Sequence, residues 1–250
     1  MSATKELNFF VRHRNWSRGA QWYESQFPND AKVRGESSPS YALHPVLTGV
    51  PERMAKIIPD ARLIYLVRDP IERLLSHYRF ARWVDRSEDR SFDEAIADLE
   101  ASHYVAASRY GMQLERYLEH FPVSRILVID RADLATNRAD TLAQVFRFLA
   151  VDDGFTTPAF AHEHNPTDGL HANVVGGLAI RLLDTAFGGG RSAAIRSGTP
   201  RALIRPLLRS PRAQPIELES ALHEDLIAYF KPDSDRLRAL TDNAFADWPT

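Results

Sequence analysis

Residues 63–78, LIYLVRDPIERLLSHY, decide the fold of this chain. The run Leu63–Val67 is apolar and rich in strand-forming residues, which predicts a strand buried on both faces, as in a parallel sheet. Asp69 is a favourable N-cap residue, Pro70 suits the first helical position, and Glu72 completes a capping box. The apolar side chains that follow recur at helical spacing, so the stretch predicts a strand, a tight turn and a helix.

Two polar residues of this stretch are candidates for binding an anion. Arg68 stands at the carboxyl end of the predicted strand, and Ser76 lies on the predicted helix. Strand, turn and helix aim a helix N-terminus, a guanidinium and a hydroxyl at one point, an arrangement suited to a phosphate-like anion. Each residue also has an ordinary interpretation, Arg68 as a solvated or salt-bridged charge and Ser76 as a polar residue bonded to its own helix.

Length and composition limit the class of protein. At 250 residues the chain can bury a full core, and a single domain over residues 1–250 is the simplest expectation. The formal net charge of −2 gives no global basic field for nucleic acid or a membrane surface. The lack of cysteine excludes disulfides, cysteine-based zinc sites and a thiol nucleophile. With no apolar run near the length of a membrane span and no signal peptide, we expect a cytoplasmic protein.

The remaining elements alternate between strands and helices. We expect strands at Lys32–Glu36 and over 125–129, and helices over 45–58, 92–99, 108–121 and 142–149. The aromatic residues of positions 9–10 and 22–27 are expected in the core. This order predicts an open α/β sheet whose ligands bind beyond the carboxyl ends of the strands.

The pattern R-D-P-x-x-R-x-x-S-x-Y, from Arg68 to Tyr78, resembles the 3′-phosphate-binding segment of sulfotransferases. These enzymes use 3′-phosphoadenosine-5′-phosphosulfate (PAPS). The resemblance implies that Arg68 and Ser76 hold the 3′-phosphate of the nucleotide and that Arg73 has a structural role. It extends from Lys5 to near the end of the chain, is closest to the bacterial and heparan-sulfate-like branch, and implies a P-loop-NTPase-like open parallel sheet flanked by helices.

Residues 5–10, KELNFF, are similar to the K-E-x-H-F-F segment of this family. The resemblance implies that Glu6 is the catalytic base and that Lys5 balances charge on the sulfuryl group. Asn8 stands where the family usually has His. A glutamate base would work better if the two phenylalanines and their neighbours shielded it from water.

Residues 35–41, GESSPSY, are similar to the family's G-E-x-S-P-x-Y element, which borders the acceptor cleft. Taken by itself, this element also fits an ordinary Ser/Pro turn. Ser37 stands where heparan-sulfate enzymes often place Lys, so a highly anionic polysaccharide acceptor is less favoured. Small-molecule, lipid and glycan acceptors all stay open, as does the oligomeric state.

The sequence lacks the glycine-rich loop, with its Lys and Ser/Thr, that would cradle the 5′-phosphosulfate in this family. The run Gly188-Gly189-Gly190 has neither the Walker-type spacing nor the Lys, and it fits a helix end and loop better. We therefore expect an N-terminally truncated form of the fold that misses its first strand and loop. Met1 would then be an internal methionine or the start of a truncated homologue.

Two functions agree with these features. The first is a PAPS-dependent sulfotransferase that moves a sulfuryl group to a hydroxyl or amine acceptor by in-line transfer. No metal is expected, because His162, His164 and His171 lack a recognisable ligand register. The alternative is a catalytically inactive nucleotide- or glycan-binding remnant of the same fold, which the absent loop favours.

Overall fold

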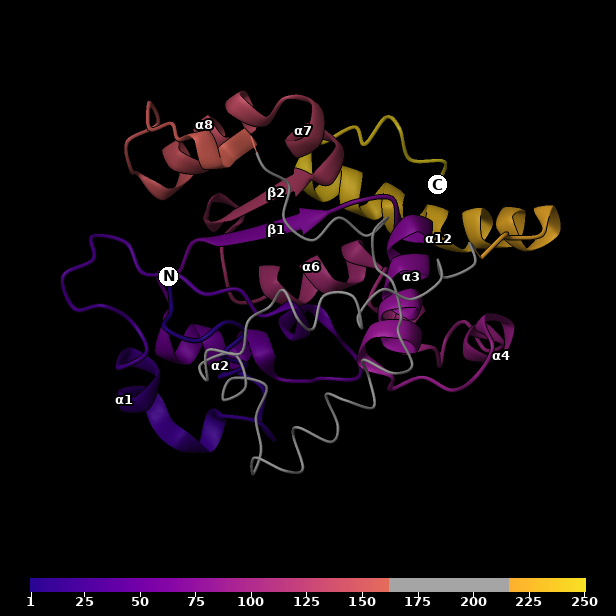
Figure 1. The fold of residues 1–250 in the computed structure, drawn as a ribbon, viewed down its shortest axis with the longest axis horizontal. Coiled ribbons are helices and arrows are strands. Elements are labelled where there is room, and N and C mark those ends of the chain that lie inside the picture. Colours follow the sequence, from indigo (N-terminus) through magenta and orange to yellow (C-terminus); the bar gives the residue numbers. More distant parts are fainter. Residues whose placement is uncertain (162–215) are drawn as a thin grey trace, which may run out of the picture. The chain divides into compact units, whose positions relative to one another are not determined.

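The computed structural model describes residues 1–161 and 216–250, and the chain divides into two compact units (Figure 1). The first unit comprises Met1–Leu74, Asp93–Phe160 and Glu219–Thr250, and it contains both strands. The second unit includes Leu75–Phe92. Helix α3, Pro70–Arg79, therefore begins in the first unit and ends in the second.

The element order is that of an α/β protein. The helices and strands besides α3 are α1 Gly19–Glu24, α2 Val50–Ile57, β1 Leu63–Val67, α4 Phe92–Ile96, α5 His103–Ala106, α6 Tyr110–Leu118, β2 Ile126–Asp130, α7 Arg131–Thr136, α8 Arg138–Leu149 and α12 Ser220–Thr241. Short 3-10 helices lie at Trp16–Arg18, Pro39–Ala42, Val123–Arg125 and Pro158–Ala161. In the second unit, α3 continues into a π-helical turn, Phe80–Asp85. None of the described helices is both long enough and apolar enough to cross a membrane.

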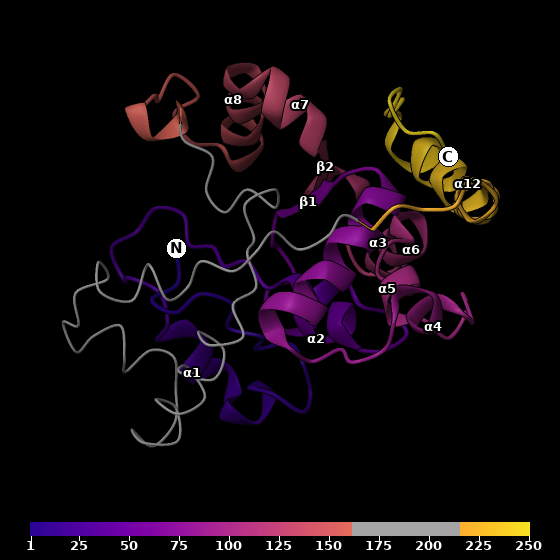
Figure 2. The ribbon, with the colours of Figure 1, turned by 45° about the vertical axis from the view of Figure 1, so that its right-hand side comes forward.

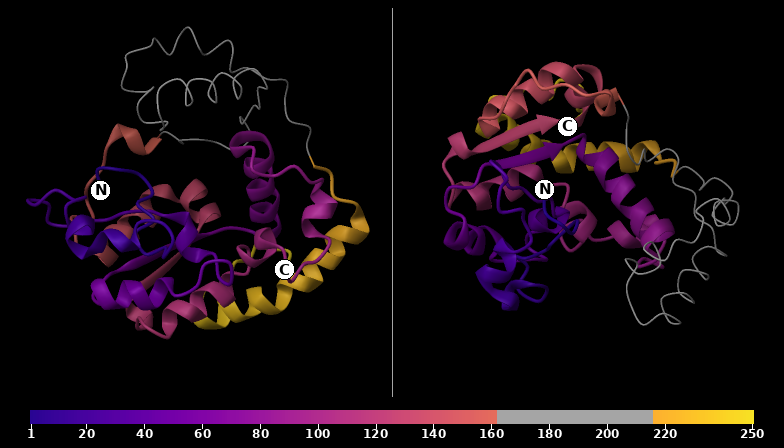
Figure 3. Two further views of the ribbon diagram at one scale, coloured as in Figure 1. Left: turned by 90° about the horizontal axis from the view of Figure 1, so that it is seen from below. Right: turned by 60° about the vertical axis from the view of Figure 1, so that its left-hand side comes forward.

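Strands β1 and β2 pair in parallel, with Leu63 opposite Ile126 and Val67 opposite Asp130. This confirms the predicted parallel pairing within an α/β fold. Helix α6 lies on one side of the strands, and α7 and α8 lie on the other (Figures 1 and 3). Because the strands are parallel, the residues that follow them, Arg68 and Arg131, lie at the same edge of the sheet.

The prediction that β1 is buried on both faces is wrong. Tyr65 and Val67 pack into the core, whereas Ile64 and Leu66, on the opposite face, are 42% and 50% exposed. Within the described residues, β1 has β2 as its one strand neighbour, and the α7–α8 pair contacts β2. The apolar run sets the strand propensity, but the number of covered faces depends on elements elsewhere in the chain.

Helices α6 and α12 cover the buried face of the sheet. Val67 and Val128 of the strands pack against Tyr110 and Leu114 of α6 and Leu237 of α12. Figure 2 shows α12 beside α6, in agreement with the contacts between these two helices. The sheet is thus anchored on one side by two helices that are far apart in the sequence.

The C-terminal tail closes this core cluster. The rings of Phe245 and Trp248 stack with their centroids 4.4 Å apart, and both side chains are buried. The Trp248 indole N–H donates a hydrogen bond to Asp130 Oδ2 at 2.9 Å, between buried side chains. This bond fastens the tail to the carboxyl end of β2.

The N-terminal segment supplies a second core cluster. Phe9 and Phe10 are both fully buried and pack with Tyr23 and Phe27. The ring of Phe9 stacks on that of Tyr23, with centroids 4.6 Å apart. Met54 of α2 completes the cluster. The prediction that these aromatic residues form core is confirmed.

Two predicted elements differ from the structure. The segment Lys32–Glu36 is irregular rather than a strand, because no neighbouring strand completes a ladder with it in the described part of the chain. The helix predicted over 45–58 begins only at Val50, after Gly49 with its φ of 72°. Glycine is suited to that left-handed conformation, and the helix starts beyond it.

Candidate functional site

Lys5 and Glu6 lie together at the surface of the first unit. Lys5 Nζ is 3.8 Å from Glu6 Oε1, and the two side chains are 81% and 47% exposed. Phe9 and Phe10 do not shield this carboxylate from water, because their rings are directed into the core. The structure therefore presents the predicted base next to the predicted lysine, but in a solvated position.

The backbone around Glu6 is held in an unusual conformation. Glu6 and Asn8 have φ angles of 56° and 49°, in the left-handed region that residues other than glycine rarely adopt. The Asn8 side-chain amide donates to the Glu6 carbonyl at 2.9 Å, a local bond that stabilises the turn. Each such residue costs roughly 1–3 kcal/mol, so neighbouring parts of the fold must hold the turn in place.

The GESSPSY element supplies part of that support. The Asn8 N–H donates to Ser38 Oγ at 3.0 Å, and the Phe10 N–H donates to the Tyr41 hydroxyl at 3.4 Å. Ser40 Oγ also donates to the Asn8 side-chain oxygen. The two sequence motifs of residues 5–10 and 35–41 are thus brought into direct contact.

Arg68 lies at the carboxyl end of β1, in the first unit, and is half-buried. Burial is the main cause that lowers the pKa of its guanidinium, and the positive charges of Arg131 and Arg73 lower that pKa further. The charges of Tyr110 and Glu72 oppose this lowering of the Arg68 pKa. A half-buried guanidinium at the end of a parallel strand, with two further arginine charges acting on it, is suited to an anionic ligand.

Asp69 caps α3 as predicted. The Glu72 N–H donates to Asp69 Oδ1 at 2.7 Å, and Pro70 occupies the first helical position. Burial, the largest cause, raises the pKa of Asp69. Its other oxygen, Oδ2, is buried and has no hydrogen-bond partner in the part of the chain that the structure describes.

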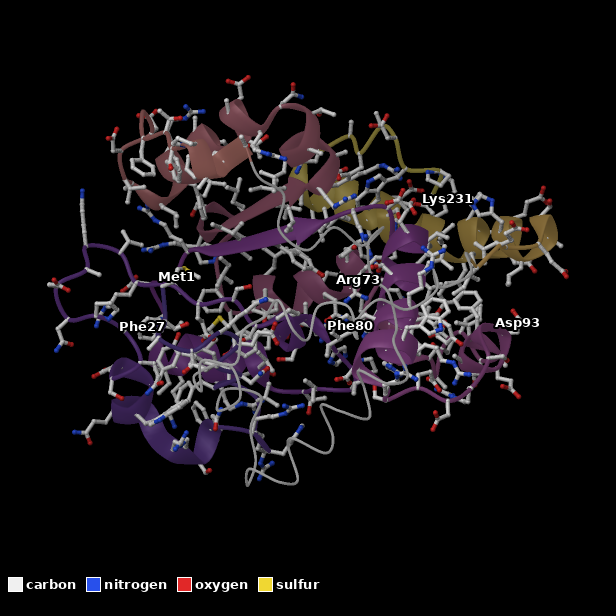
Figure 4. The ribbon with its side chains drawn as sticks, in the orientation of Figure 1. Met1, Phe27, Arg73, Phe80, Asp93 and Lys231 are labelled. Atoms are coloured by element: carbon white, nitrogen blue, oxygen red, sulfur yellow. The ribbon has the colours of Figure 1, made fainter. Side chains whose placement is uncertain are left out.

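Two tyrosines lie beneath the end of β1. The Arg68 N–H donates to the Tyr110 hydroxyl at 3.4 Å, and burial raises the pKa of Tyr110 to about 12. The buried Tyr65 hydroxyl has no partner among the described residues, and burial raises its pKa well above the usual value. The charge of Arg73, a residue of α3 that Figure 4 labels, opposes both shifts.

Ser76 lies on α3 beyond Leu74, in the second unit, and is half-buried. The same unit holds Tyr78, whose hydroxyl donates to the Arg90 carbonyl at 2.7 Å. Glu88 is buried there and pairs with the Arg90 guanidinium at 2.8 Å. The structure thus places Arg68 in one unit and Ser76 in the other, and their joint role stays a prediction.

Arg131 is a candidate that reasoning from the sequence missed. It follows β2 directly, just as Arg68 follows β1, and its positive charge acts on Arg68. The signal was present in the sequence, because an apolar run over 126–129 ends in Asp130 and Arg131. Recognising it required knowing that the two strands are neighbours in register.

Other candidates from the sequence fall outside the described residues. These are the three histidines at 162, 164 and 171 and the glycine run at 188–190. Within residues 1–161 and 216–250, no group of three His, Asp or Glu side chains is arranged to hold a metal ion.

Two cavities lie in the first unit, and neither is lined by Glu6 or Arg68. One of about 90 Å³ is bordered by Tyr41, His44 and Tyr117, so the last residue of the GESSPSY element borders it. The other, of about 580 Å³, runs along β2 and is lined by Asp130, Asp140 and residues 243–247 of the tail.

Comparisons with known proteins agree with these features. The family described as "Sulfotransferase domain" matches residues 2–157. Heparan sulfate glucosamine 3-O-sulfotransferase 5 of Mus musculus is 28% identical over 160 residues, which cover 60% of this chain and 45% of that protein. Heparan sulfate glucosamine 3-O-sulfotransferase 6 of Homo sapiens is 28% identical over 213 residues, which cover 81% of this chain and 58% of that protein. The chain spans about half the length of these two relatives.

A solved structure has the same fold. The crystal structure of a sulfotransferase from Alicyclobacillus acidocaldarius matches with a TM-score of 0.64 and 22% sequence identity. The match covers 100% of this chain and 87% of that one. Because the matched family spans residues 2–157, more than half of the sequence, this chain belongs to the sulfotransferase domain family.

Proposed function

We propose that the chain binds PAPS and takes part in the transfer of its sulfuryl group to a hydroxyl or amine acceptor. The single observation that carries this proposal is Arg68, a half-buried cation at the end of a parallel strand, on which Arg131 and Arg73 also act with positive charge. We infer PAPS as the nucleotide because the chain belongs to the sulfotransferase domain family. The Arg68 guanidinium would bind one of its phosphates.

Arg68 and Ser76 would hold the 3′-phosphate. The guanidinium offers paired N–H donors to phosphate oxygens, and a serine hydroxyl adds one more donor. The charge of Arg131, at the same edge of the sheet, would favour the same anion. For the 5′-phosphosulfate, the described residues offer no glycine-rich loop, so the proposal assigns that group to none of them.

Glu6 would act as the base of the reaction. As the acceptor oxygen or nitrogen attacks sulfur, its proton passes to Glu6. The bond between sulfur and the oxygen of the 5′-phosphate breaks, and 3′-phosphoadenosine-5′-phosphate leaves. Lys5, whose Nζ is 3.8 Å from Glu6 Oε1, would balance negative charge on the sulfuryl group. Catalysis of this kind depends mainly on positioning and on charge stabilisation.

Among acceptors, we place glycans first. The relatives reported above are named for action on heparan sulfate glucosamine, an amino sugar within a polysaccharide. Ser37 is exposed in the GESSPSY element, so this position adds no positive charge for a sulfated chain. A glycan of lower charge therefore fits the described surface better than a highly sulfated one.

Calorimetric titration of 3′-phosphoadenosine-5′-phosphate into the 250-residue chain tests the nucleotide site. Arg68→Ala removes a charge-assisted contact worth about 1.5–3 kcal/mol, so we expect roughly 10- to 100-fold weaker binding. Arg147→Ala, at an exposed arginine with a surface ion pair to Asp153, is the matched control and should bind like the wild type. Equal affinity of Arg68→Ala and wild type, or no binding by folded wild type, contradicts the proposal.

The alternative function is a non-catalytic module that binds a nucleotide or glycan. The solvated position of Glu6 favours it, because an exposed carboxylate is a weak base for a hydroxyl proton. Assays of sulfuryl transfer from PAPS to amino-sugar oligosaccharides separate the two. Nucleotide binding without turnover on any acceptor supports the module, and turnover excludes it.

A further inference from the structure

The Glu36 carboxylate lies at the end of two hydrogen-bond chains that start at the backbone of Asn8 and Phe10. In the first chain, the Asn8 N–H donates to Ser38 Oγ at 3.0 Å, and Ser38 Oγ donates to Glu36 Oε2 at 2.9 Å. In the second, the Phe10 N–H donates to the Tyr41 hydroxyl at 3.4 Å, which donates to Glu36 Oε1 at 2.9 Å. Each oxygen of Glu36 therefore ends one chain.

The hydroxyl groups of this network can act only as donors toward Glu36. Burial is the main cause that raises the pKa of Tyr41, and the Glu36 charge raises it further. The same two causes raise the pKa of Tyr23. Both tyrosines keep their protons at ordinary pH, so the direction of each hydrogen bond is fixed by the carboxylate.

The far side of the network is anchored to the core. The Tyr117 hydroxyl of α6 donates to the Tyr41 carbonyl at 2.9 Å. Tyr23 and Phe10 are buried in the N-terminal cluster. Glu36 thus connects the strained Glu6–Asn8 turn to a rigid part of the first unit.

We propose that Glu36 is a positioning residue for Glu6: through Ser38 and Tyr41 it holds the Glu6–Asn8 turn in the conformation that presents the Glu6 carboxylate. This inference rests on the proposed function, because it gives Glu36 a role in a reaction that Glu6 serves. Without an acceptor at position 36, the hydroxyls of Ser38 and Tyr41 would turn elsewhere, and the backbone at Glu6 and Asn8 would leave its unfavourable φ region.

The first test compares Glu36→Gln with Glu24→Gln, a matched change at an exposed glutamate on α1. A side-chain amide can accept from one hydroxyl but not from two at once in this arrangement. We expect kcat to fall roughly 10- to 100-fold in Glu36→Gln, as for a small misplacement of a reacting group. KM for PAPS and the affinity for 3′-phosphoadenosine-5′-phosphate should stay unchanged, and Glu24→Gln should behave like the wild type.

A second pair of variants keeps the test valid if Glu36→Gln fails to fold. Ser38→Thr retains a hydroxyl, whereas Ser38→Val introduces a side chain of nearly the same shape as threonine but without the hydroxyl. We expect Ser38→Thr to retain turnover and Ser38→Val to lose it. Equal kcat in these two variants, or an unchanged kcat in Glu36→Gln, overturns the inference.

Amide hydrogen exchange separates failure of this inference from failure of the proposed function. In the wild type, the Asn8 and Phe10 amides should be protected, and Glu36→Gln or Ser38→Val should accelerate exchange at Asn8 while α6 stays protected. If the wild type shows no turnover but this pattern appears, Glu36 orders the segment and the proposed function fails. If exchange at Asn8 is the same in all variants, the inference fails whatever the activity.

Discussion

The Asp233 carboxylate on α12 caps the amino end of α6 at Gly111, although these two residues are 122 positions apart in the sequence. Asp233 Oδ2 accepts from the Gly111 N–H at 2.8 Å, and Oδ1 accepts from the Met112 N–H at 2.9 Å. The first N–H groups of a helix have no partner within it, so a carboxylate here satisfies two of them and complements the helix dipole. The contact joins the C-terminal helix to the helix that supports the sheet.

We expect Asp233→Asn to destabilise the fold. An amide side chain accepts only through its single oxygen, so one of the two N–H groups, buried at Gly111 and partly buried at Met112, loses its partner, at a cost of about 1.5–3 kcal/mol. Urea unfolding followed by circular dichroism measures the change. Asp235→Asn, at an exposed residue of the same helix, is the control and should change stability far less. A change in Asp233→Asn no larger than in the control would contradict the capping role.

Gly111→Ala should also destabilise the fold, although alanine normally stabilises a helix relative to glycine. A Cβ at Gly111 would lie 2.6 Å from the Asp233 carbonyl oxygen, so backbone would have to move. Overpacking of this kind costs roughly 1–3 kcal/mol. Thermal unfolding measures the change, with Gly154→Ala, whose added Cβ meets no atom closer than 3.4 Å, as the control. Equal melting temperatures for the two variants would show that the contact is loose.

The half-buried carboxyl of Asp69 predicts a pH dependence of unusual sign. Burial raises its pKa from the ordinary value of 3.8, so the folded chain binds this proton more tightly than the unfolded chain does. Its contribution to stability is therefore fully present below the ordinary pKa and is lost as pH rises through the raised value. Asp69→Asn keeps an equally good N-cap and does not titrate, so its stability relative to the wild type should increase as pH rises from the ordinary pKa of 3.8 through the raised value.

Denaturant unfolding of both chains across this pH range measures the effect of Asp69→Asn. Asp235→Asn provides the opposite case, because hydrogen bonding to Lys231 is the largest cause that lowers the pKa of Asp235. The stability of Asp235→Asn relative to the wild type should therefore fall as pH rises through the lowered pKa toward 3.8, at lower pH than the change expected for Asp69→Asn. A stability difference between Asp69→Asn and wild type that is constant with pH would rule out the raised pKa.

Glu6→Gln should abolish sulfuryl transfer and leave nucleotide binding intact, because the amide keeps the size of the side chain but cannot take a proton. The measurement is turnover from PAPS together with calorimetric binding of 3′-phosphoadenosine-5′-phosphate. Glu24→Gln serves again as the exposed control. Full activity in Glu6→Gln would remove Glu6 from the role of base.

The local part of the fold was predictable from the sequence. The bounds of β1, the Asp69 cap and the burial of Phe9 and Phe10 follow from strand propensity, capping chemistry and aromatic content, which act over a few residues. These local predictions were confirmed because the tertiary contacts of the same residues favour the same conformations. The contact of residues 5–10 with residues 35–41 was not among the predictions from the sequence.

Features that depend on distant partners could not be predicted in this way. The exposure of Leu66 depends on which helices cover β1, and the missing strand at Lys32–Glu36 depends on a neighbour that the local sequence does not specify. The role of Arg131 depends on the register of two strands, and the α6 cap depends on Asp233, which lies far along the chain. The solvation of Glu6 likewise depends on the conformation of the turn at Asn8. The neighbouring phenylalanines, which were expected to shield Glu6, do not determine it.

The bond between Trp248 and Asp130 gives the chain an internal optical probe. Indole fluorescence responds to the group that accepts the Nε1 hydrogen and to stacked rings, and Trp248 has both a carboxylate and Phe245 as close neighbours. Its acceptor, Asp130, directly precedes Arg131 at the end of β2. Emission from this one tryptophan, with the other three replaced by phenylalanine, would therefore report when the tail leaves the edge of the sheet where the nucleotide is proposed to bind.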